Sequence, residues 1–226
     1  MDLGAQAAGI GALADDTRRT LYEYVSGQED AVGREQAATA LGLALHNVTF
    51  HLDRLVAEGL LEVEYRRLSG RTGPGAGRPS KLYRRASREF AVSLPPRRYD
   101  LVGDILAAAV SRAGAGTPLD QALHDCARHE GLSLGQVTEG LDGTAAFAGL
   151  ATVLSSQGFE PKVEDDEVVL ANCPFDALAQ KHTALVCGLN QSFVQGVADG
   201  LAADVTARLE PEPGRCCVKV RPTSRA

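Results

Sequence analysis

The sequence of 226 residues contains no tryptophan, one methionine and few aromatic residues, which make up 5% of the chain. It also has no long uninterrupted apolar run. The most apolar stretch, LVGDILAAAVSRAGAG, is broken by Asp104 and Arg112 and is too short to span a bilayer. The first residues have neither the basic start nor the apolar core of a secretory signal. We therefore expect a cytoplasmic protein with no membrane partner.

The motifs of the common enzyme classes are missing as well. The chain has no Walker loop, no nucleophile elbow, no HExxH and no paired acidic motif. The adjacent Asp165 and Asp166 fall at a predicted hairpin tip, where such residues are usually solvated. The sequence therefore predicts that the protein is not an enzyme.

Composition and charge indicate what the chain can contact. Hydrophobic residues make up 44% and charged residues 23%, so the chain should bury a core. The net charge of −6 is uneven: residues 1–98 hold 14 Lys and Arg against 12 Asp and Glu, whereas residues 99–226 hold 9 against 17. Residues 60–98 alone hold 10 basic and 3 acidic residues. A local basic segment in an acidic protein predicts a confined contact with a polyanion.

Apolar spacing predicts three helices in the first half, over about 15–26, 34–41 and 45–58. Gly59 can end the third helix. A second and third helix joined by a tight turn with a glycine is typical of the helix-turn-helix motif.

The third of these helices has two faces. Val48, Leu52 and Leu55 recur at helical spacing and should face the core. On the other face, asparagine can bind an adenine edge with two hydrogen bonds, and an aromatic ring can contact a thymine methyl group. Packing of the ring on a neighbouring helix is the alternative. The candidate DNA-contacting residues of this helix are His46, Asn47, Thr49, Phe50 and Arg54.

The segment after the third helix predicts a hairpin. LLEVEYRR alternates apolar and polar residues, and KLYRRA returns as a second strand after the loop LSGRTGPGAGRPS. Basic side chains there suit the phosphate backbone or a minor groove, although a solvated basic loop is the alternative. The candidate residues are Arg66, Arg67, Arg71, Arg78 and Lys81.

NVTFHLDRLVAEGLLE followed by GRPSKLY resembles the winged-helix repressors of the ArsR/MarR type, over about residues 11–90. The resemblance implies that residues 1–98 form a winged helix-turn-helix domain whose last helix lies in the major groove. It also implies a homodimer that binds an operator in double-stranded DNA.

The second half predicts a different architecture. Pro95 and Pro96 mark a linker, and two helices over about 100–113 and 118–132 suggest a helical linker or dimerisation segment over residues 99–140; ordinary core is the competing interpretation. From residue 143 the order is helix, two strands, helix, two strands. This order predicts a small α+β sandwich over residues 141–226 and an α+β class for the whole chain.

Five cysteines in a cytoplasmic protein are expected to be reduced thiols, metal ligands or redox sensors. Cys173 follows a predicted strand and Cys187 lies in a predicted helix, while Cys216 and Cys217 begin the last predicted strand. Strand alternation points the last two to opposite faces, so only one should join a given cluster. Converging thiolates suit zinc or an iron–sulfur cluster, and buried core cysteine is the alternative, which we assign to Cys126.

NCPF, HTALVCGLN and the late cysteines after GR resemble the carboxy-terminal domain of SufR-type regulators. These are winged-helix repressors whose cysteines hold an iron–sulfur cluster and which control cluster-assembly genes. The resemblance implies that Cys173, Cys187 and one of Cys216 and Cys217 bind a cluster such as [4Fe–4S]. The fourth ligand stays open between His182, Asp176, the other cysteine of the pair and a small molecule. Zinc, thiol oxidation or a small apolar ligand are the alternative signals.

Overall fold

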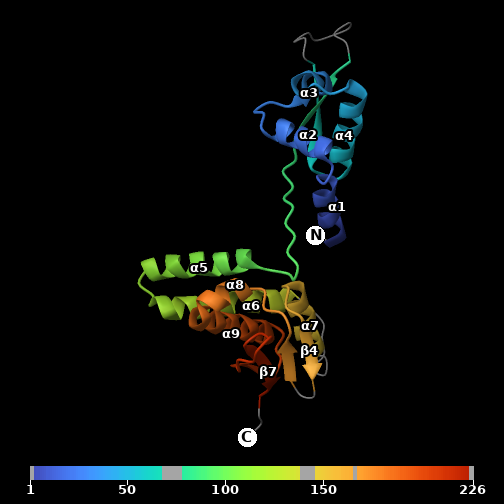
Figure 1. Ribbon diagram of the computed structural model, residues 1–226. Helices are drawn as coiled ribbons and strands as arrows, with labels where there is room; N and C mark the ends of the chain where they lie inside the picture. Colours follow the sequence, from blue (N-terminus) through green and yellow to red (C-terminus); the bar gives the residue numbers. More distant parts are fainter. Residues whose placement is uncertain (1–2, 68–77, 138–145, 165–166, 224–226) are drawn as a thin grey trace. The chain divides into compact units, whose positions relative to one another are not determined.

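The computed structural model of the protein describes residues 3–67, 78–137, 146–164 and 167–223. The chain divides into two compact units, Met1–Val92 and Ser93–Ala226 (Figure 1). Each unit combines helices with one antiparallel sheet, so the predicted α+β class is confirmed.

In the amino-terminal unit, the three predicted helices and both predicted strands are confirmed to within about one residue at each end. A three-stranded antiparallel sheet has the order β1-β3-β2. Helix α1, which the sequence did not predict, packs Gly9 against the ring of Phe90. The elements are α1 (Leu3–Ala12), α2 (Asp16–Ser26), β1 (Val32–Gly33), α3 (Arg34–Leu41), α4 (Leu45–Ala57), β2 (Leu61–Arg66) and β3 (Ser80–Arg85).

Local signals in the sequence fix the ends of these helices. The Asp15 carboxylate accepts a hydrogen bond of 2.9 Å from the backbone N–H of Arg18 and begins α2. Gly59, with φ of +75°, follows the end of α4, and the Leu60 N–H then reaches the Leu55 carbonyl at 2.9 Å. Only glycine adopts this left-handed conformation without strain, so α4 ends where the sequence predicts.

The core of this unit lies between α2, α4 and the sheet. Val48, Leu52 and Leu55 are fully buried, as the spacing predicted, and they pack with Leu21 and Tyr83. Because this face of α4 is used for the core, its opposite face is left to solvent.

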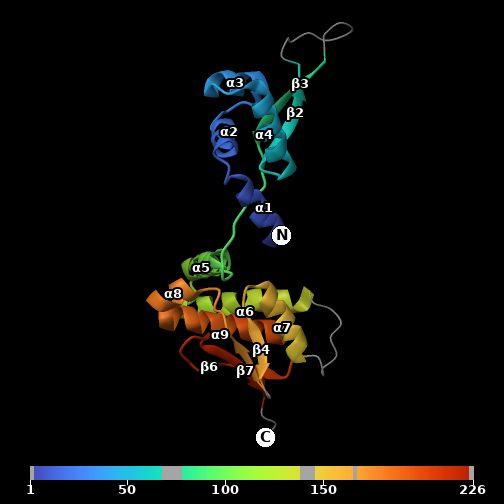
Figure 2. The same ribbon diagram turned by 45° about the vertical axis from the view of Figure 1, so that its right-hand side comes forward.

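The carboxy-terminal unit places its helices on one face of a four-stranded antiparallel sheet of order β4-β5-β7-β6 (Figure 2). The predicted order of helices and strands is confirmed, except that the long helix predicted from about 176 to 201 breaks at His182. The elements are α5 (Tyr99–Gly114), α6 (Leu119–Val137), α7 (Ala146–Ser156), β4 (Pro161–Glu164), β5 (Glu167–Leu170), α8 (Asp176–Lys181), α9 (Thr183–Gly200), β6 (Val205–Leu209) and β7 (Val218–Pro222). The predicted acidic tip at 165–166 lies outside the described residues.

Helices α5 and α6, which cover most of the predicted linker or dimerisation segment 99–140, pack within the second unit. Ile105 and Ala109 of α5 and Ala127 of α6 are buried in one apolar core together with residues of the sheet. The boundary between the units falls before Ser93, so the chain from Pro95 onward is already part of the second unit. The interpretation of α5 and α6 as ordinary core is the one that the burial of their apolar faces favours.

Glycines bring α6 and α9 unusually close together. A Cβ atom at Gly196 would lie 2.1 Å from the Arg128 carbonyl oxygen, and one at Gly131 would lie 2.1 Å from the Phe193 carbonyl oxygen. Such distances exclude any side chain, so the two helix backbones touch directly. Gly135 and Gly200 continue the same contact one turn further along.

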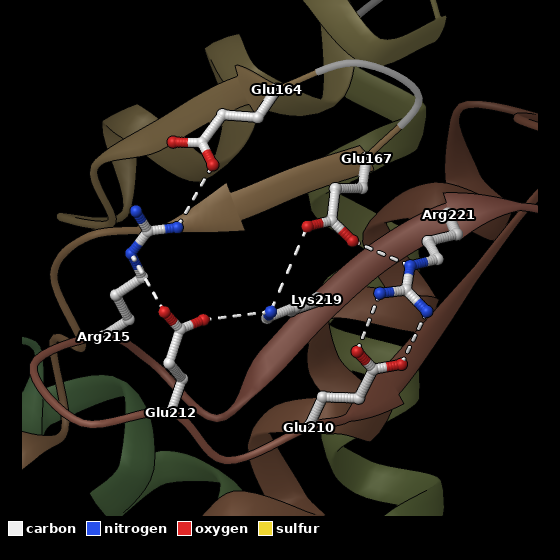
Figure 3. Close-up of polar contacts among 7 residues, drawn as sticks. All are labelled: Glu164, Glu167, Glu210, Glu212, Arg215, Lys219 and Arg221. Carbon is white, nitrogen blue, oxygen red and sulfur yellow. Dashed lines mark hydrogen bonds and ion pairs between the residues drawn. The ribbon is translucent and has the colours of Figure 1, made fainter.

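The outer face of the sheet carries a network of ion pairs (Figure 3). The Arg221 guanidinium contacts Glu210 through two nitrogens at 2.9 and 2.8 Å and Glu167 at 2.7 Å. The ammonium group of Lys219 lies 3.0 Å from Glu212. These contacts join β5, β7 and the chain after β6, so they hold the segment that leads into β7 against the sheet.

Candidate functional site

The sheet topology brings three of the cysteines to one place. Strands β5 and β7 are antiparallel neighbours in which Val168 pairs with Val220, so the end of β5 lies beside the start of β7. Cys173 follows the end of β5, whereas Cys216 and Cys217 directly precede β7. The backbone N–H of Cys216 donates to the Leu170 carbonyl at 2.9 Å.

Cys187 joins them from the second turn of α9, so the four thiols come from a loop, a helix and a turn. Side-chain hydrogen bonds connect Cys173 to Cys216, Cys216 to Cys217, and Cys217 to Cys187. The structure thus places both Cys216 and Cys217 in one row with Cys173 and Cys187, whereas the sequence predicts that only one of the pair joins a given cluster. Strand alternation does not apply to the pair, because β7 begins only at Val218.

The hydrogen bonds divide the four thiols into two kinds. The hydrogen bond with Cys216 lowers the pKa of Cys173, and hydrogen bonds with Cys216 and Cys187 lower the pKa of Cys217 to about 6. The hydrogen bonds to Cys173 and Cys217 raise the pKa of Cys216, and burial raises the pKa of Cys187 to about 12. Two thiols with a lowered pKa thus alternate with two thiols with a raised pKa, and a lowered pKa makes a cysteine a better ligand for a soft cation.

A buried amide lies against this row of sulfurs. Asn190 is only 1% exposed, and its Nδ2 donates to the Cys216 Sγ at 3.2 Å. Its Oδ1 is buried and has no hydrogen-bond partner within the described residues. An unsatisfied buried acceptor costs about 1–3 kcal/mol, so it calls for an explanation at this position. The sequence carried a signal for this residue, because Cys187 and Asn190 are spaced i, i+3 on one helix face.

The other residues that the sequence offers as ligands lie at different distances from the row of thiols. His182 is exposed at the junction of α8 and α9, and it is not among the groups that act on the thiols. The Asp176 carboxylate is near enough to oppose ionisation of Cys173, and its backbone N–H donates to the Cys173 carbonyl at 3.1 Å. Cys126 is buried in the α5–α6 part of the core, so its assignment as a core residue is confirmed.

The donor set fits the groups that the sequence suggested. Four cysteines bind zinc in structural sites and hold iron–sulfur clusters, and N–H groups directed at the sulfurs tune such centres. Within the parts of the chain that the structure describes, no three His, Cys, Asp or Glu side chains are already arranged as a formed metal site. The thiols contact each other in a row, so ligation would require their side chains to turn toward a common centre.

The exposed face of α4 carries the candidate DNA-contacting residues of that helix. His46 and Asn47 are exposed, and Phe50 is 65% exposed. The Phe50 ring meets His51 edge-on with the ring centroids 5.2 Å apart, and it does not pack on a neighbouring helix within the described residues. The Thr49 hydroxyl donates to the Leu45 carbonyl at 2.9 Å, so it is already used within the helix.

Several basic candidates have acidic partners. Arg54 pairs with Glu58 at 2.6 Å, and Lys81 donates to the Asp53 carboxylate at 2.5 Å. The Tyr83 hydroxyl also donates to Asp53, at 2.9 Å. Although partial burial opposes ionisation of Asp53, the hydrogen bonds from Lys81 and Tyr83 lower its pKa. These bonds fix α4 against β3.

The hairpin and the start of α3 enclose a basic depression. It has a volume of about 380 Å³ and is lined by Arg34, Tyr65, Arg78 and Lys81, together with the acidic Glu35. Two further predicted residues lie near it in sequence: Arg67 is exposed, and Arg66 contacts Glu64 at 3.5 Å. Arg71 lies outside the described residues.

No family model, no curated protein and no solved structure matches the chain. None of the helices in the described parts of the chain combines the length and the apolar character needed to cross a membrane.

Proposed function

We propose that the protein is a DNA-binding transcriptional regulator of the SufR type, acting as a repressor, whose carboxy-terminal cysteines sense iron–sulfur cluster status. The observation that carries this proposal is the row of four thiols beside a buried amide whose oxygen has no partner. Core cysteines need no such neighbour. A metal or cluster centre does need such a neighbour, because N–H donors directed at its sulfur ligands hold them in place.

The amino-terminal unit supports the DNA-binding part of the proposal. Helices α3 and α4, the short turn between them and the antiparallel strands β2 and β3 support a winged helix-turn-helix. In that arrangement α4 would enter the major groove, with Asn47 and Phe50 reading base edges. Arg78 and Lys81 of the hairpin would contact phosphates, as would Arg34 at the start of α3.

The cysteine centre would be held by Cys173, Cys187, Cys216 and Cys217. An iron–sulfur cluster bound there would supply a group whose presence depends on iron, sulfide and oxidants. Zinc is the second candidate, because the same four thiols suit it equally. A small apolar ligand has less support: the cavity of about 620 Å³ beside α9 and β6 has a polar lining that includes Arg128, Gln195 and Asp199.

We propose no catalytic activity. The arrangement that comes nearest to a nucleophilic site is Ser192, whose hydroxyl lies 2.8 Å from Nδ1 of His124. Nε2 of that ring is 3.9 Å from Asp120, a carboxylate with 94% of its side chain exposed. An exposed pair of this kind lacks the desolvation and the oxyanion donors that activate a serine.

A homodimer follows from the proposed class, since such regulators bind paired half-sites. The outer face of α5 is a candidate dimer surface, because Val110 is 63% exposed there and Gly103 and Gly114 leave open space around the helix. Sedimentation of the full chain with Val110→Glu, compared with the wild type, tests this assignment.

The first experiment is anaerobic purification followed by measurement of visible absorption, iron and acid-labile sulfide. We expect a brown protein with a broad visible band that is lost in Cys173→Ser and Cys216→Ser. Cys126→Ala is the matched control, because this thiol lies in the core away from the row, and it should keep the colour. A colourless wild-type protein with zinc would contradict the cluster and leave zinc sensing. A wild-type protein with neither would contradict the metal centre.

A further inference from the structure

The segment 96–98, near the start of the second unit, is bound to the loop that carries Cys173. Arg97 lies in this segment, and its Nη1 donates to the Asn172 side-chain oxygen at 2.7 Å and to the Cys173 carbonyl at 3.1 Å. Its other terminal nitrogen, Nη2, lies 3.9 Å from Asp176. The Arg97 side chain is only 20% exposed, so these contacts are largely shielded from water.

The loop makes further hydrogen bonds to the segment 96–98 through groups of its own. Nδ2 of Asn172 donates to the Pro96 carbonyl at 3.2 Å, and the Pro174 carbonyl accepts from the backbone N–H of Arg98 at 3.1 Å. Each of the three residues from 172 to 174 is therefore hydrogen-bonded to the segment 96–98. Asn172 is 8% exposed, so its amide cannot exchange these partners freely for water.

The residues that follow α7 also contact the segment 96–98 and Asn172. Gln157 accepts a hydrogen bond of 2.5 Å from Nη1 of Arg98, and the Gly158 carbonyl accepts from Asn172 at 2.6 Å. Gly158 has φ of +86°, and a Cβ atom there would lie 2.9 Å from the Pro96 side chain. Only glycine allows the segment to pass so closely, so the segment 96–98 is held between two loops of the second unit.

These contacts give Cys173 a direct mechanical connection to the chain that leads to the first unit. A shift of the Cys173 backbone on ligation would reach the segment 96–98 through these hydrogen bonds. The carbonyl of Cys173 and the side chain of Asn172 are the groups that Arg97 holds. Cys187, Cys216 and Cys217 have no hydrogen bond to the segment 96–98 within the described residues.

We propose that Arg97 is a positioning residue that couples the cysteine centre to DNA binding. Its contacts with Asn172 and Cys173 differ between the loaded and unloaded centre, so that loading changes the placement of the segment 96–98 and with it the DNA affinity. The inference rests on the proposed function. A ligand shifts such an equilibrium only through unequal affinity for the two states, and the resulting coupling is typically about 5- to 150-fold in affinity.

The test measures the ratio of DNA affinities of the full chain with and without anaerobic reconstitution by iron and sulfide. The DNA is a double-stranded fragment enriched by the wild-type protein from a random pool. We expect Arg97→Met to bring this ratio close to one, while iron content and the affinity of the unloaded protein stay at wild-type values. Arg97→Lys, which keeps a charged donor, should restore part of the ratio.

Arg128→Met is the matched control, because Arg128 makes an ion pair of 2.7 Å with Asp199 in the same unit, away from the segment 96–98. It should keep the wild-type ratio. Hydrogen exchange of the Arg98 amide gives a second measurement without DNA: its protection should depend on loading in the wild type and not in Arg97→Met.

The outcomes separate the two proposals. If the wild-type ratio differs from one and Arg97→Met keeps that ratio, the role of Arg97 alone is overturned. An equal loss of the ratio in Arg128→Met would overturn it as well. A wild type that takes up iron and sulfide but has a ratio of one would overturn both the coupling and the sensing function. A wild type that takes up no iron would overturn the cluster itself. If Arg97→Met lost iron, the Arg97→Lys variant would decide. A wild-type ratio of DNA affinities in Arg97→Lys, together with Arg98 amide protection that does not change on loading, would overturn the role of Arg97.

Discussion

In the amino-terminal unit the candidate DNA-contacting residues that the structure describes lie on α4 or on and beside β2 and β3, close together in sequence and at least partly exposed. In the carboxy-terminal unit the four cysteines come from three separated segments and lie partly or wholly buried. The first site is a surface left over after one helix face is used for the core. The second exists only once β5, β7 and α9 have packed. A change to a core residue should therefore affect the two sites differently.

The two units also differ in how their helices pack. In the first unit α2 and α4 meet through large aliphatic side chains such as Leu21 and Leu52. In the second, α6 and α9 meet through glycines, backbone against backbone. Large side chains tolerate a small loss of volume at a cost, whereas a backbone contact tolerates no added atom.

The two faces of α4 should respond in opposite ways. Leu52→Ala is expected to lower the free energy of unfolding of the first unit by about 2–5 kcal/mol, because it leaves a cavity in the core. Phe50→Ala should change it by less than about 0.5 kcal/mol, because the ring is exposed, but it should weaken DNA binding. Urea unfolding followed by tyrosine fluorescence measures the first effect, since four of the five tyrosines lie in this unit and the chain has no tryptophan. An equal loss of stability in both variants would contradict the assignment of faces.

The glycine contact between α6 and α9 should reject a single methyl group. Gly196→Ala is expected to destabilise the second unit by about 1–3 kcal/mol, because the helices must move apart. Gly103→Ala in α5 is the matched control: its Cβ would meet nothing within 4 Å, so the better helix propensity of alanine should stabilise by up to about 1 kcal/mol. Thermal unfolding followed by circular dichroism checks both. Similar shifts in the two variants would show that α6 and α9 separate at little cost.

The buried amide should matter more for ligand binding than for folding. Asn190→Leu removes the N–H donor to Cys216 and the unpartnered oxygen, so the metal-free protein should be as stable as the wild type or more stable. Its affinity for zinc, used as a probe of the four thiols, should fall by about 10- to 100-fold. Titration against a competing chelator measures this, with Gln180→Leu on the exposed surface of α8 as the control. Unchanged zinc affinity in Asn190→Leu would argue against its role at the centre.

The smallest effect concerns pH and the first unit. The hydrogen bonds from Lys81 and Tyr83 lower the pKa of Asp53 below its usual 3.8, so Asp53 contributes stability above that pH and loses it as the pH falls through the lower folded pKa. The carboxylate is about half exposed, so solvent screening limits this contribution to less than about 1 kcal/mol. The stabilities of the wild type and Asp53→Asn should therefore converge between about pH 5 and pH 2. A constant difference across this range would contradict the assignment.

Most elements of both units could be predicted from the sequence, because their signals are local. The spacing of Val48, Leu52 and Leu55 placed the core face of α4, and Gly59 placed its end. Misplaced boundaries have identifiable causes. The long helix was predicted without its break at His182, since no proline or glycine marks it. Cys216 and Cys217 were assigned to the last strand, although regular pairing begins only at Val218.

Local periodicity thus determined by itself most of the order of helices and strands, the α+β class and the two faces of α4, because hydrophobic spacing and turn residues act within a few positions of the chain. Only the tertiary structure decided that four of the five cysteines of the second unit meet, that Asn190 lies against Cys216, and that Arg97 holds the loop of Cys173. Those contacts depend on the pairing of β5 with β7 and on the close packing of α6 and α9. Strand pairing and helix crossing join residues far apart in sequence, and no periodicity in the chain encodes which of them will touch.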